Sequence, residues 1–209
     1  MPRPSRFAVL ALLALLPACA TSDPGATPSP SPTATPGPQL RCSAEDAEVA
    51  EATGLDDLPD PVVRVRAEIT AAARECDYAE LESIARRLGP SFTYDDQGPR
   101  RGDTIQASGY WRNREVQGDP VLTRLVFLLN LPWSSVTFDG ADSPADLGSG
   151  EVTVYSWPST TSDGIWGELE EIYPATDVAQ WRADGVYLGE RVSITEAGRW
   201  FEFAPARRT

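Results

Sequence analysis

The sequence predicts an α+β fold, and two observations support this prediction. Between residues 60 and 88, apolar side chains recur at the three- and four-residue spacing of helices. From residue 134 onward, short runs with strand-like alternation are separated by turns that contain Gly or Pro. Helices that come first and antiparallel strands that come later are typical of α+β proteins, whereas α/β proteins alternate the two.

Two adjoining helices are predicted at the start of the domain. The first is expected to begin at Asp60-Pro61, because an N-cap followed by proline is a frequent helix start. Asp77 and Glu80 resemble a capping box at the start of the second helix, which Gly89-Pro90 ends. The apolar stripes expected to be buried are Val62, Val65, Ile69, Ala72 and Cys76 in the first helix, and Tyr78, Leu81, Ile84, Ala85 and Leu88 in the second.

The later elements are predicted from a change of period. A strongly apolar helix is expected over residues 120–130, where it ends before Pro132, and another helical stretch over residues 166–173. Residues 97–103 and 141–150 are expected to be loops. Strands are expected at residues 91–96, 134–140, 151–158, 185–195 and 199–203, and the last two flank a three-residue hairpin loop.

Part of the chain resembles a known superfamily. Residues 71–88, AAARECDYAELESIARRL, followed by SFTY, resemble the opening of the cone-shaped α+β rolls of the nuclear transport factor 2-like superfamily. The segments YSWP (155–158) and YLGERVSITEAGRWFEF (187–203) are similar to parts of uncharacterised exported bacterial domains. The resemblance covers residues 61–203 and implies early helices packed on a curved sheet. This superfamily contains enzymes, binding modules and oligomerisation domains, so the resemblance implies a fold without implying a function.

The N-terminal segment has the three parts of an export signal. Arg3 and Arg6 provide a positive start, residues 7–16 form an apolar run, and small residues follow. A transmembrane helix needs about 20 apolar residues, and this run is much shorter, so a signal peptide over residues 1–18 is predicted.

A lipid anchor is implied by a second resemblance. Leu16-Pro17-Ala18-Cys19 resembles the lipobox of bacterial lipoproteins. This resemblance implies cleavage before Cys19, a lipid on this cysteine, and a protein held in the membrane on the outer side of the cytoplasmic membrane. The alternative is an ordinary secretory cleavage site followed by a free thiol.

Residues 19–40 are predicted to be a Pro/Ser/Thr-rich flexible tether. Between residues 20 and 39, six prolines lie among Ala, Ser, Thr and Gly, a composition that forms no core and favours an extended, disordered spacer. The remaining residues, 41–209, are predicted to form one domain. With Cys19 lipidated, Cys42 and Cys76 are left as a pair that we expect to form a disulfide outside the cytoplasm. Two reduced, buried thiols are the alternative.

The charge balance excludes several classes of function. The 18 basic residues are all arginine, against 31 acidic residues, and the formal net charge is −13. Such a chain repels phosphate backbones, so no nucleic-acid partner is predicted. Because His and Lys are absent, Ser-His-Asp, Cys-His and Schiff-base chemistry are excluded. We therefore predict no catalytic residue, no cofactor and no metal.

Aromatic residues and one arginine on the predicted strands are candidate ligand contacts. Residues two apart on a strand share a face, which groups Tyr155 with Trp157. Rolls of the superfamily named above bind ligands inside the cone, and an aromatic concavity with one fixed charge suits a glycan or a lipid-like ligand. The expected partner is a small molecule, a glycan or a protein. The predicted ligand face consists of Tyr94, Trp111, Tyr155, Trp157, Tyr187 and Arg191. The alternative is that these rings fill the core or cover its rim.

Carboxylates support a second hypothesis, the hydrolysis of a glycoside. That reaction needs two carboxyl groups about 5 to 9 Å apart on either side of the scissile bond. Candidates are Asp95, Asp96, Glu168, Glu170, Glu171 and Glu190. A further acidic group, Asp139, Asp142 and Asp146, lacks the spacing of an EF-hand, so a solvated loop is predicted there rather than a calcium site.

The sequence thus predicts a lipid-anchored, non-catalytic binding module at the cell surface. One alternative is a carboxylate-dependent hydrolase that acts on envelope glycans, which requires a cleft with two convergent acids. The other is a purely structural component of the envelope, which predicts an exposed apolar patch instead of a pocket.

Overall fold

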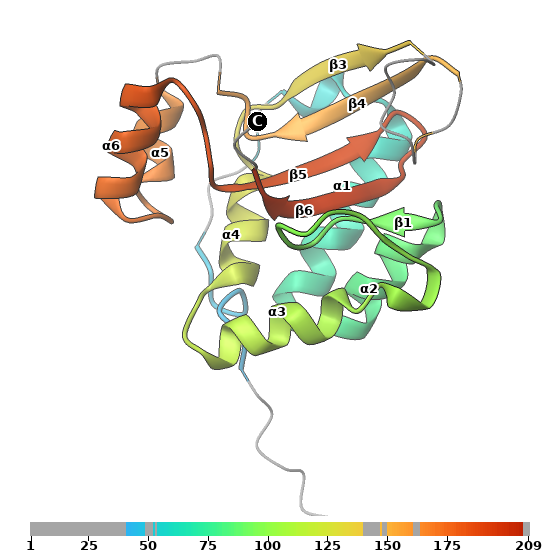
Figure 1. Ribbon diagram of the computed structural model, residues 1–209, viewed down its shortest axis with the longest axis horizontal. Coiled ribbons are helices and arrows are strands. Elements are labelled where there is room, and N and C mark those ends of the chain that lie inside the picture. The colour runs from blue at the N-terminus through green and yellow to red at the C-terminus, as the bar shows by residue number, and fades with distance from the viewer. Residues whose placement is uncertain are drawn as a thin grey trace, which may run out of the picture. The chain divides into compact units, whose positions relative to one another are not determined.

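Figure 1 shows the computed structural model, which describes residues 41–48, 52, 54–139, 147, 150–160 and 164–206. The predicted signal peptide (1–18) and the predicted tether (19–40), with Cys19, lie outside the described residues. In the part that is described, no helix is long and apolar enough to cross a membrane. The elements named below all belong to residues 40–209.

Helices and strands follow one another in the order η1 (Leu55–Asp57), α1 (Asp60–Arg74), α2 (Tyr78–Arg87), β1 (Ser91–Phe92), β2 (Arg100–Arg101), η2 (Gly102–Thr104), α3 (Ala107–Val116), α4 (Val121–Leu128), β3 (Ser134–Phe138), β4 (Val152–Trp157), α5 (Ile165–Leu169), α6 (Ala175–Asp184), β5 (Glu190–Thr195) and β6 (Trp200–Pro205). The combination of helices with a four-stranded antiparallel sheet confirms the predicted α+β class. Figure 1 shows α1 running behind the sheet, on one face of it.

The first two helices form where their sequence patterns predict them. In α1, Pro61 occupies the first turn, Pro59 takes the N-cap position, and Asp60 is the first helical residue rather than the cap. In α2, the Asp77 side chain accepts a hydrogen bond of 2.9 Å from the backbone N–H of Glu80, as an N-cap does. The predicted stripes face the core, where Val62, Ile69 and Leu81 are fully buried, although Leu88 is exposed.

Two helices, α3 and α6, were not predicted from the sequence. In α3 only Ala107 and Trp111 are buried, and in α6 only Val178 is buried. With so few buried positions, neither segment shows the apolar stripe by which a helix is found. The strand predicted at 91–96 is also too long, because β1 ends at Phe92. The predicted loop at 97–103 contains β2 and the first two residues of η2.

The sheet has the strand order β3-β4-β5-β6, with every neighbouring pair antiparallel. Its β6 edge is extended by Thr93, which follows β1 and lies parallel to β6. The N–H of Thr93 donates to the carbonyl of Phe201, and the N–H of Phe203 donates to the carbonyl of Thr93, both at 2.9 Å. The main chain of β6 is therefore paired on both sides at this point.

The face of the sheet that meets the helices is filled by large side chains. Trp157, Val192 and Phe203 project from three neighbouring strands into the core. There the indole of Trp111 in α3 stacks on that of Trp200 at 5.6 Å between ring centroids, with 15° between their planes. Offset aromatic packing of this kind adds to the free energy gained by burial.

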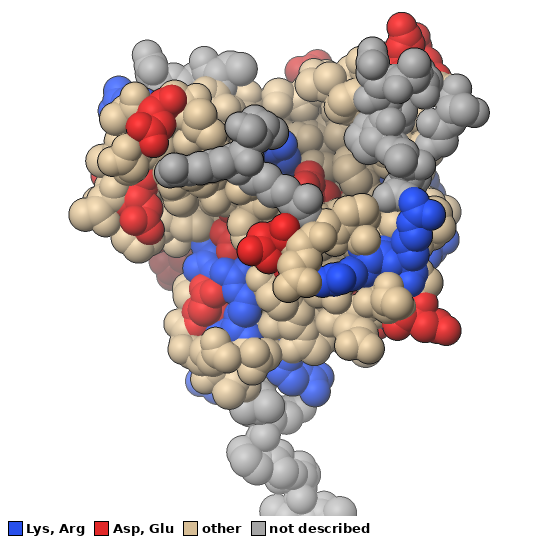
Figure 2. Space-filling view, in the orientation of Figure 1, with Lys and Arg blue, Asp and Glu red and all other residues tan. Residues whose placement is uncertain are grey.

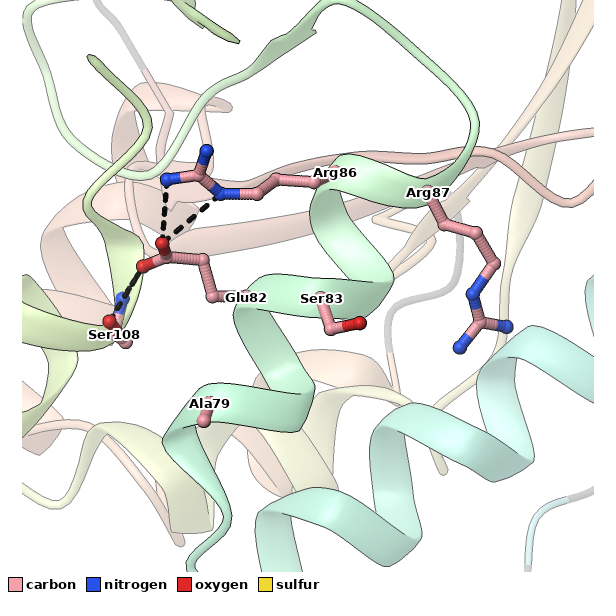
Figure 3. Close-up of a pocket in the computed structure, with 6 residues that line it drawn as sticks. All are labelled: Ala79, Glu82, Ser83, Arg86, Arg87 and Ser108. Atoms are coloured by element: carbon pink, nitrogen blue, oxygen red, sulfur yellow. Dashed lines mark hydrogen bonds and ion pairs between the residues drawn. The ribbon is translucent and has the colours of Figure 1, made fainter. Parts of the chain in front are cut away.

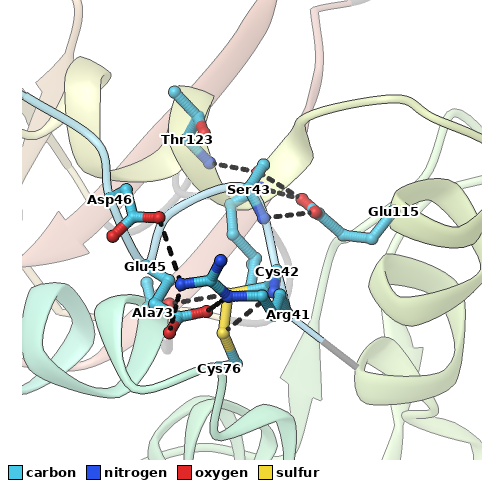
Figure 4. Close-up of a disulfide and its surroundings, with 10 residues drawn as sticks. Arg41, Cys42, Ser43, Glu45, Asp46, Ala73, Cys76, Glu115 and Thr123 are labelled. Atoms are coloured by element: carbon cyan, nitrogen blue, oxygen red, sulfur yellow. Dashed lines mark hydrogen bonds and ion pairs between the residues drawn. A yellow bond between two sulfur atoms is a disulfide. The ribbon is translucent and has the colours of Figure 1, made fainter. Parts of the chain in front are cut away.

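A disulfide joins Cys42 to Cys76, as the sequence predicted (Figure 4). Cys76 lies beyond the end of α1 rather than on its helical stripe, and its φ of +56° is in the left-handed region. The N–H of Cys76 donates to Ala73 and that of Asp77 donates to Ala72, the two bonds of a Schellman motif. Glycine is the usual residue in this left-handed conformation. A cysteine there lowers the free energy of unfolding by about 1–2 kcal/mol relative to an unstrained residue.

The segment next to the disulfide also supports the start of α4. Glu115 accepts hydrogen bonds from the N–H of Leu122 and from the N–H and hydroxyl of Ser43, at 2.7 to 2.8 Å (Figure 4). The Ser43 hydroxyl accepts from the N–H of Thr123 at 3.0 Å. The N-cap residue of α4 is Pro120, which has no side-chain cap, so Ser43 and Glu115 satisfy its first N–H groups instead.

We predict opposite effects for alanine at two glycines. Gly198 in the β5–β6 hairpin has a φ of +81°, and a Cβ there would lie 2.9 Å from the carbonyl oxygen of Pro61. Gly198→Ala should therefore lower the free energy of unfolding by about 1–3 kcal/mol. Gly109 lies in α3, and a Cβ added there would have no other atom within 4 Å. Gly109→Ala should therefore raise the free energy of unfolding by about 0.5–1 kcal/mol, because alanine favours the helix more than glycine does. Urea unfolding measures both, and an equal effect of the two changes would contradict the structure.

Candidate functional site

The candidate site lies on the outer face of the sheet, where a row of polar side chains crosses three strands. Ser156 of β4 is opposite Ser193 of β5, which is opposite Glu202 of β6. The Ser156 and Ser193 hydroxyl oxygens are 3.1 Å apart, and the Ser193 hydroxyl donates to the Glu202 carboxylate at 2.8 Å. A register shift between Ser193 and Ile194 accompanies this pairing. The row is thus created by strand register rather than by proximity in the sequence.

The hydrogen bonds in this row have a definite direction. A serine hydroxyl has one hydrogen, and that of Ser193 is donated to Glu202. In the bond between the two serines, Ser156 must therefore be the donor and Ser193 the acceptor. Ser156 has then used its only hydrogen, so its oxygen can act toward a further group only as an acceptor.

This row forms part of the floor of a groove with a volume of about 660 Å³. Phe138, Val154 and Phe201 contribute apolar surface, and Thr93 and Tyr187 also line the groove. Ligand sites of proteins typically combine apolar walls with a few placed polar groups and have volumes of about 300–1,000 Å³. The groove therefore has the size and the mixture of surfaces of a small-ligand site.

One basic side chain, Arg191, lines the groove among the residues that the structure describes. It lies two residues before Ser193 on β5, so the two share the outer face, and Arg191 is exposed. No described residue forms an ion pair or a hydrogen bond with its guanidinium. Figure 2 shows acidic and basic side chains interspersed on the side in view, with uncharged areas between them.

The structure separates the six residues of the predicted ligand face. Tyr187 and Arg191 line the groove. Trp111 and Trp157 are fully buried in the core, and Tyr94 is buried beside the ring of Tyr110 at 5.4 Å. Tyr155 shares the face of Trp157, as its spacing predicts, but this is the face toward the helices, where Tyr155 packs on Trp133.

Sequence reasoning did not identify Ser156, Ser193 or Glu202. Each is a single polar residue within a strand, and a lone serine or glutamate in a strand pattern has no special meaning. What distinguishes them is that the register sets them opposite one another. Only the alternation within ERVSIT and WFEF hints that such residues could share the outer face.

The carboxylates considered for hydrolysis lie elsewhere. Glu190 is buried between two arginines, with its oxygen 2.7 Å from Arg114 and 3.2 Å from Arg124. It also accepts a hydrogen bond from the hydroxyl of Tyr173 at 2.5 Å. Burial, together with the negative charge of Glu190, raises the pKa of the Tyr173 phenol well above its ordinary value. These groups are fully engaged with one another, as a structural cluster is.

The other candidate carboxylates are also outside the groove. Asp95 is buried and pairs with Arg100 at 3.0 Å. The remaining four, Asp96, Glu168, Glu170 and Glu171, are exposed. Asp142 and Asp146 of the predicted acidic loop lie outside the described residues. Within the described ranges, no group of three or more His, Cys, Asp or Glu side chains is arranged to hold a metal ion.

A second hollow, of about 500 Å³, lies beside α2 and the start of α3 (Figure 3). Its central group is Glu82, which accepts hydrogen bonds from the N–H and hydroxyl of Ser108 at 2.9 and 2.6 Å. Both Nε and Nη2 of Arg86 also donate to it, at 3.1 and 2.7 Å. Glu82 thus caps the N-terminus of α3 from the neighbouring helix, and its oxygens are already used.

No protein-family model, curated protein or solved structure matches the chain. The case for a function therefore depends on the geometry of the groove.

We predict that Glu82 contributes to the loss of stability in acid. Burial alone raises the pKa of its carboxyl, but the hydrogen bonds from Ser108 and Arg86 outweigh burial and leave the pKa below its ordinary value. A carboxyl with a lowered pKa in the folded state stabilises above its unfolded pKa of about 4.3, and this contribution is lost as pH falls through the folded value.

Glu82→Gln should therefore lower the free energy of unfolding at pH 7 by about 1–3 kcal/mol and make its decline between pH 5 and pH 3 less steep. Urea unfolding at a series of pH values measures this. Glu75→Gln, at an exposed position in the same region, is the control and should keep the slope of the parent protein. Parallel pH curves for Glu82→Gln and the parent protein would contradict the assignment.

Proposed function

We propose that the domain is a non-catalytic binding module, held on the outer side of the cytoplasmic membrane by a lipid on Cys19, with its ligand in the outer groove. The observation that carries the proposal is the hydrogen-bonded row of Ser156, Ser193 and Glu202 in the groove. Polar side chains fixed by one another before a ligand arrives lower the entropic cost of binding.

The groove favours binding over hydrolysis. Glu202 is the one carboxylate among the described residues that line it, whereas a glycosidase of the ordinary type needs two. Ser193 is only 2% exposed, and its hydroxyl donates its hydrogen to Glu202. This arrangement suits a residue of a hydrogen-bond network better than a catalytic nucleophile. The described lining therefore supplies recognition groups without a pair of acid and base.

The groove also favours binding over a purely structural role. A structural component was expected to expose a continuous apolar patch. In the described ranges the exposed large apolar side chains belong to four separate segments: Leu88 after α2, Val116 at the end of α3, Val136 in β3 and Val186 after α6. Apolar residues scattered singly in this way are normal for a protein surface.

Export and anchoring are supported by the sequence of residues 1–40 and by the disulfide. Disulfides persist in oxidising compartments, and the bond between Cys42 and Cys76 suits a domain outside the cytoplasm. The resemblance of residues 16–19 to a lipobox supplies the attachment, and the Pro-rich segment after it supplies a spacer.

We predict that filling the groove abolishes binding. The full chain in detergent would be applied to one array that carries oligosaccharides and short peptides, and each bound probe would be titrated. Ser156→Leu removes the acceptor oxygen and adds volume in the groove, so it should weaken binding at least tenfold. Thr137→Val is the matched control, because it also breaks a hydroxyl pair between strands, with Thr153, but outside the groove.

Thermal unfolding of both variants would establish that each is folded under the conditions of the array. An array without bound probes, or binding that survives Ser156→Leu, would contradict the proposed function.

We predict that Cys19→Ala releases the protein from the membrane fraction. One or more acyl chains contribute about 0.8 kcal/mol per buried CH₂, and no described helix could replace them as an anchor. Fractionation of cells that express each form, followed by intact mass of the extracted protein, measures both location and lipid. Full retention of Cys19→Ala in the membrane, or an extracted protein without acyl mass, would contradict lipid anchoring.

A further inference from the structure

We infer that the ligand of the groove is an acidic saccharide, whose carboxylate pairs with Arg191 and whose hydroxyl group donates to Ser156. The inference rests on the proposed binding function and adds the chemical class of the ligand. It follows from the order of charges and hydrogen-bonding groups along the outer face of β5 and its neighbours.

The polarity of the row selects a ligand that donates hydrogen bonds. Since Ser156 donates its hydrogen to Ser193, its oxygen faces a ligand as an acceptor. A ligand that meets this part of the groove has to donate hydrogen bonds. Sugar hydroxyl groups do so, whereas a carboxylate or an ionised phosphate has no hydrogen to donate to the Ser156 oxygen.

The position of Arg191 provides a positive charge for the ligand. It lies on the same face as Ser193, two residues along β5, which corresponds to about 7 Å of strand. Two other arginines of the domain, Arg114 and Arg124, are closely paired with Asp119 and Glu190, but Arg191 has no acidic partner among the described residues. An exposed guanidinium at the border of a groove binds a carboxylate through charge-assisted hydrogen bonds.

The lining of the groove also contains apolar surface. Phe138 and Phe201 supply rings, and Val154 supplies aliphatic surface. A sugar ring has apolar C–H faces as well as polar edges, so it can cover such a surface while its hydroxyl and carboxylate groups reach the polar residues. Hydroxyl donors, one negative charge and an apolar ring face together describe a uronic acid or a related acidic sugar.

A peptide fits this groove less well. Extended peptides usually bind by adding a strand to a free sheet edge. At the groove, the outer edge of β6 is already paired with Thr93 through two main-chain hydrogen bonds. The other edge of the sheet, β3, pairs only with β4 among the described strands, but a strand added there would lie about 10 Å from the strand that carries Ser156. A peptide that contacts the row of Ser156, Ser193 and Glu202 would therefore have to bind across the face without main-chain pairing, which is the main source of affinity in that mode.

The test compares matched saccharides that differ only in charge. Oligosaccharides of galacturonate, glucuronate and N-acetylmuramate, each beside its methyl ester, would be titrated calorimetrically into the full chain in detergent. We expect at least one acid to bind at least tenfold more tightly than its ester, and we expect this preference to shrink in high salt. Arg191→Gln should reduce the preference to less than twofold. Arg64→Gln, at an exposed position on α1, is the control for charge and should keep it.

The outcomes separate this inference from the proposed function. Equal binding of acid and ester by the parent protein, or a preference that persists in Arg191→Gln, overturns the acidic-saccharide inference. If the binding of acid and ester alike is lost in Ser156→Leu, the groove remains a binding site, but Arg191 does not select the charge of its ligand. Binding of peptides alone likewise overturns the inference while a binding function stands, and an absence of binding to saccharides and peptides overturns both.

Discussion

The buried carboxylate of Glu190 is the interaction on which the arrangement of the other elements depends. It joins the start of β5 to Arg114 of α3 at 2.7 Å, to Arg124 of α4 at 3.2 Å and to Tyr173, just before α6, at 2.5 Å. A buried charge is costly unless opposite charges and hydrogen bonds surround it, and loss of one partner from such a cluster typically costs about 3–5 kcal/mol. The helices α3 and α4, the turn between α5 and α6, and the sheet are therefore held together by one carboxylate.

The same interaction determines which face of β5 is turned outward. Successive side chains of a strand point to opposite faces, so an inward Glu190 places Val192 in the core and Arg191 and Ser193 on the outside. A shift of β5 by one residue would bury Arg191 and expose Val192. The ion pairs and the hydrogen bond of Glu190 oppose this shift, because they require Glu190 to point inward. The groove and its charge are thus consequences of a buried ion cluster on the opposite side of the sheet.

The demand for core volume explains why four of the aromatic residues predicted for the ligand face, Tyr94, Trp111, Tyr155 and Trp157, do not line the groove. Trp111, Trp157 and Trp200 are among the largest fully buried side chains of the domain, and no comparable group replaces them. Their burial contributes more free energy than their exposure in a concavity would. The helix side of the sheet is consequently filled, and the ligand site falls on the outer side, which is lined by smaller and more polar residues such as Ser156 and Ser193.

By itself, the sequence determined the features that depend on local patterns. The helical stripes of α1, α2 and α4, the strands β4 to β6 and the pairing of Cys42 with Cys76 could be predicted because spacing, capping residues and cysteine count are properties of the chain. Tertiary structure alone decided the helices α3 and α6, the register that brings Ser156, Ser193 and Glu202 together, and the face of β4 that meets the core. In VTVYSW both faces carry apolar side chains, so periodicity could not choose between them, and the choice was made by the helices packed against one face.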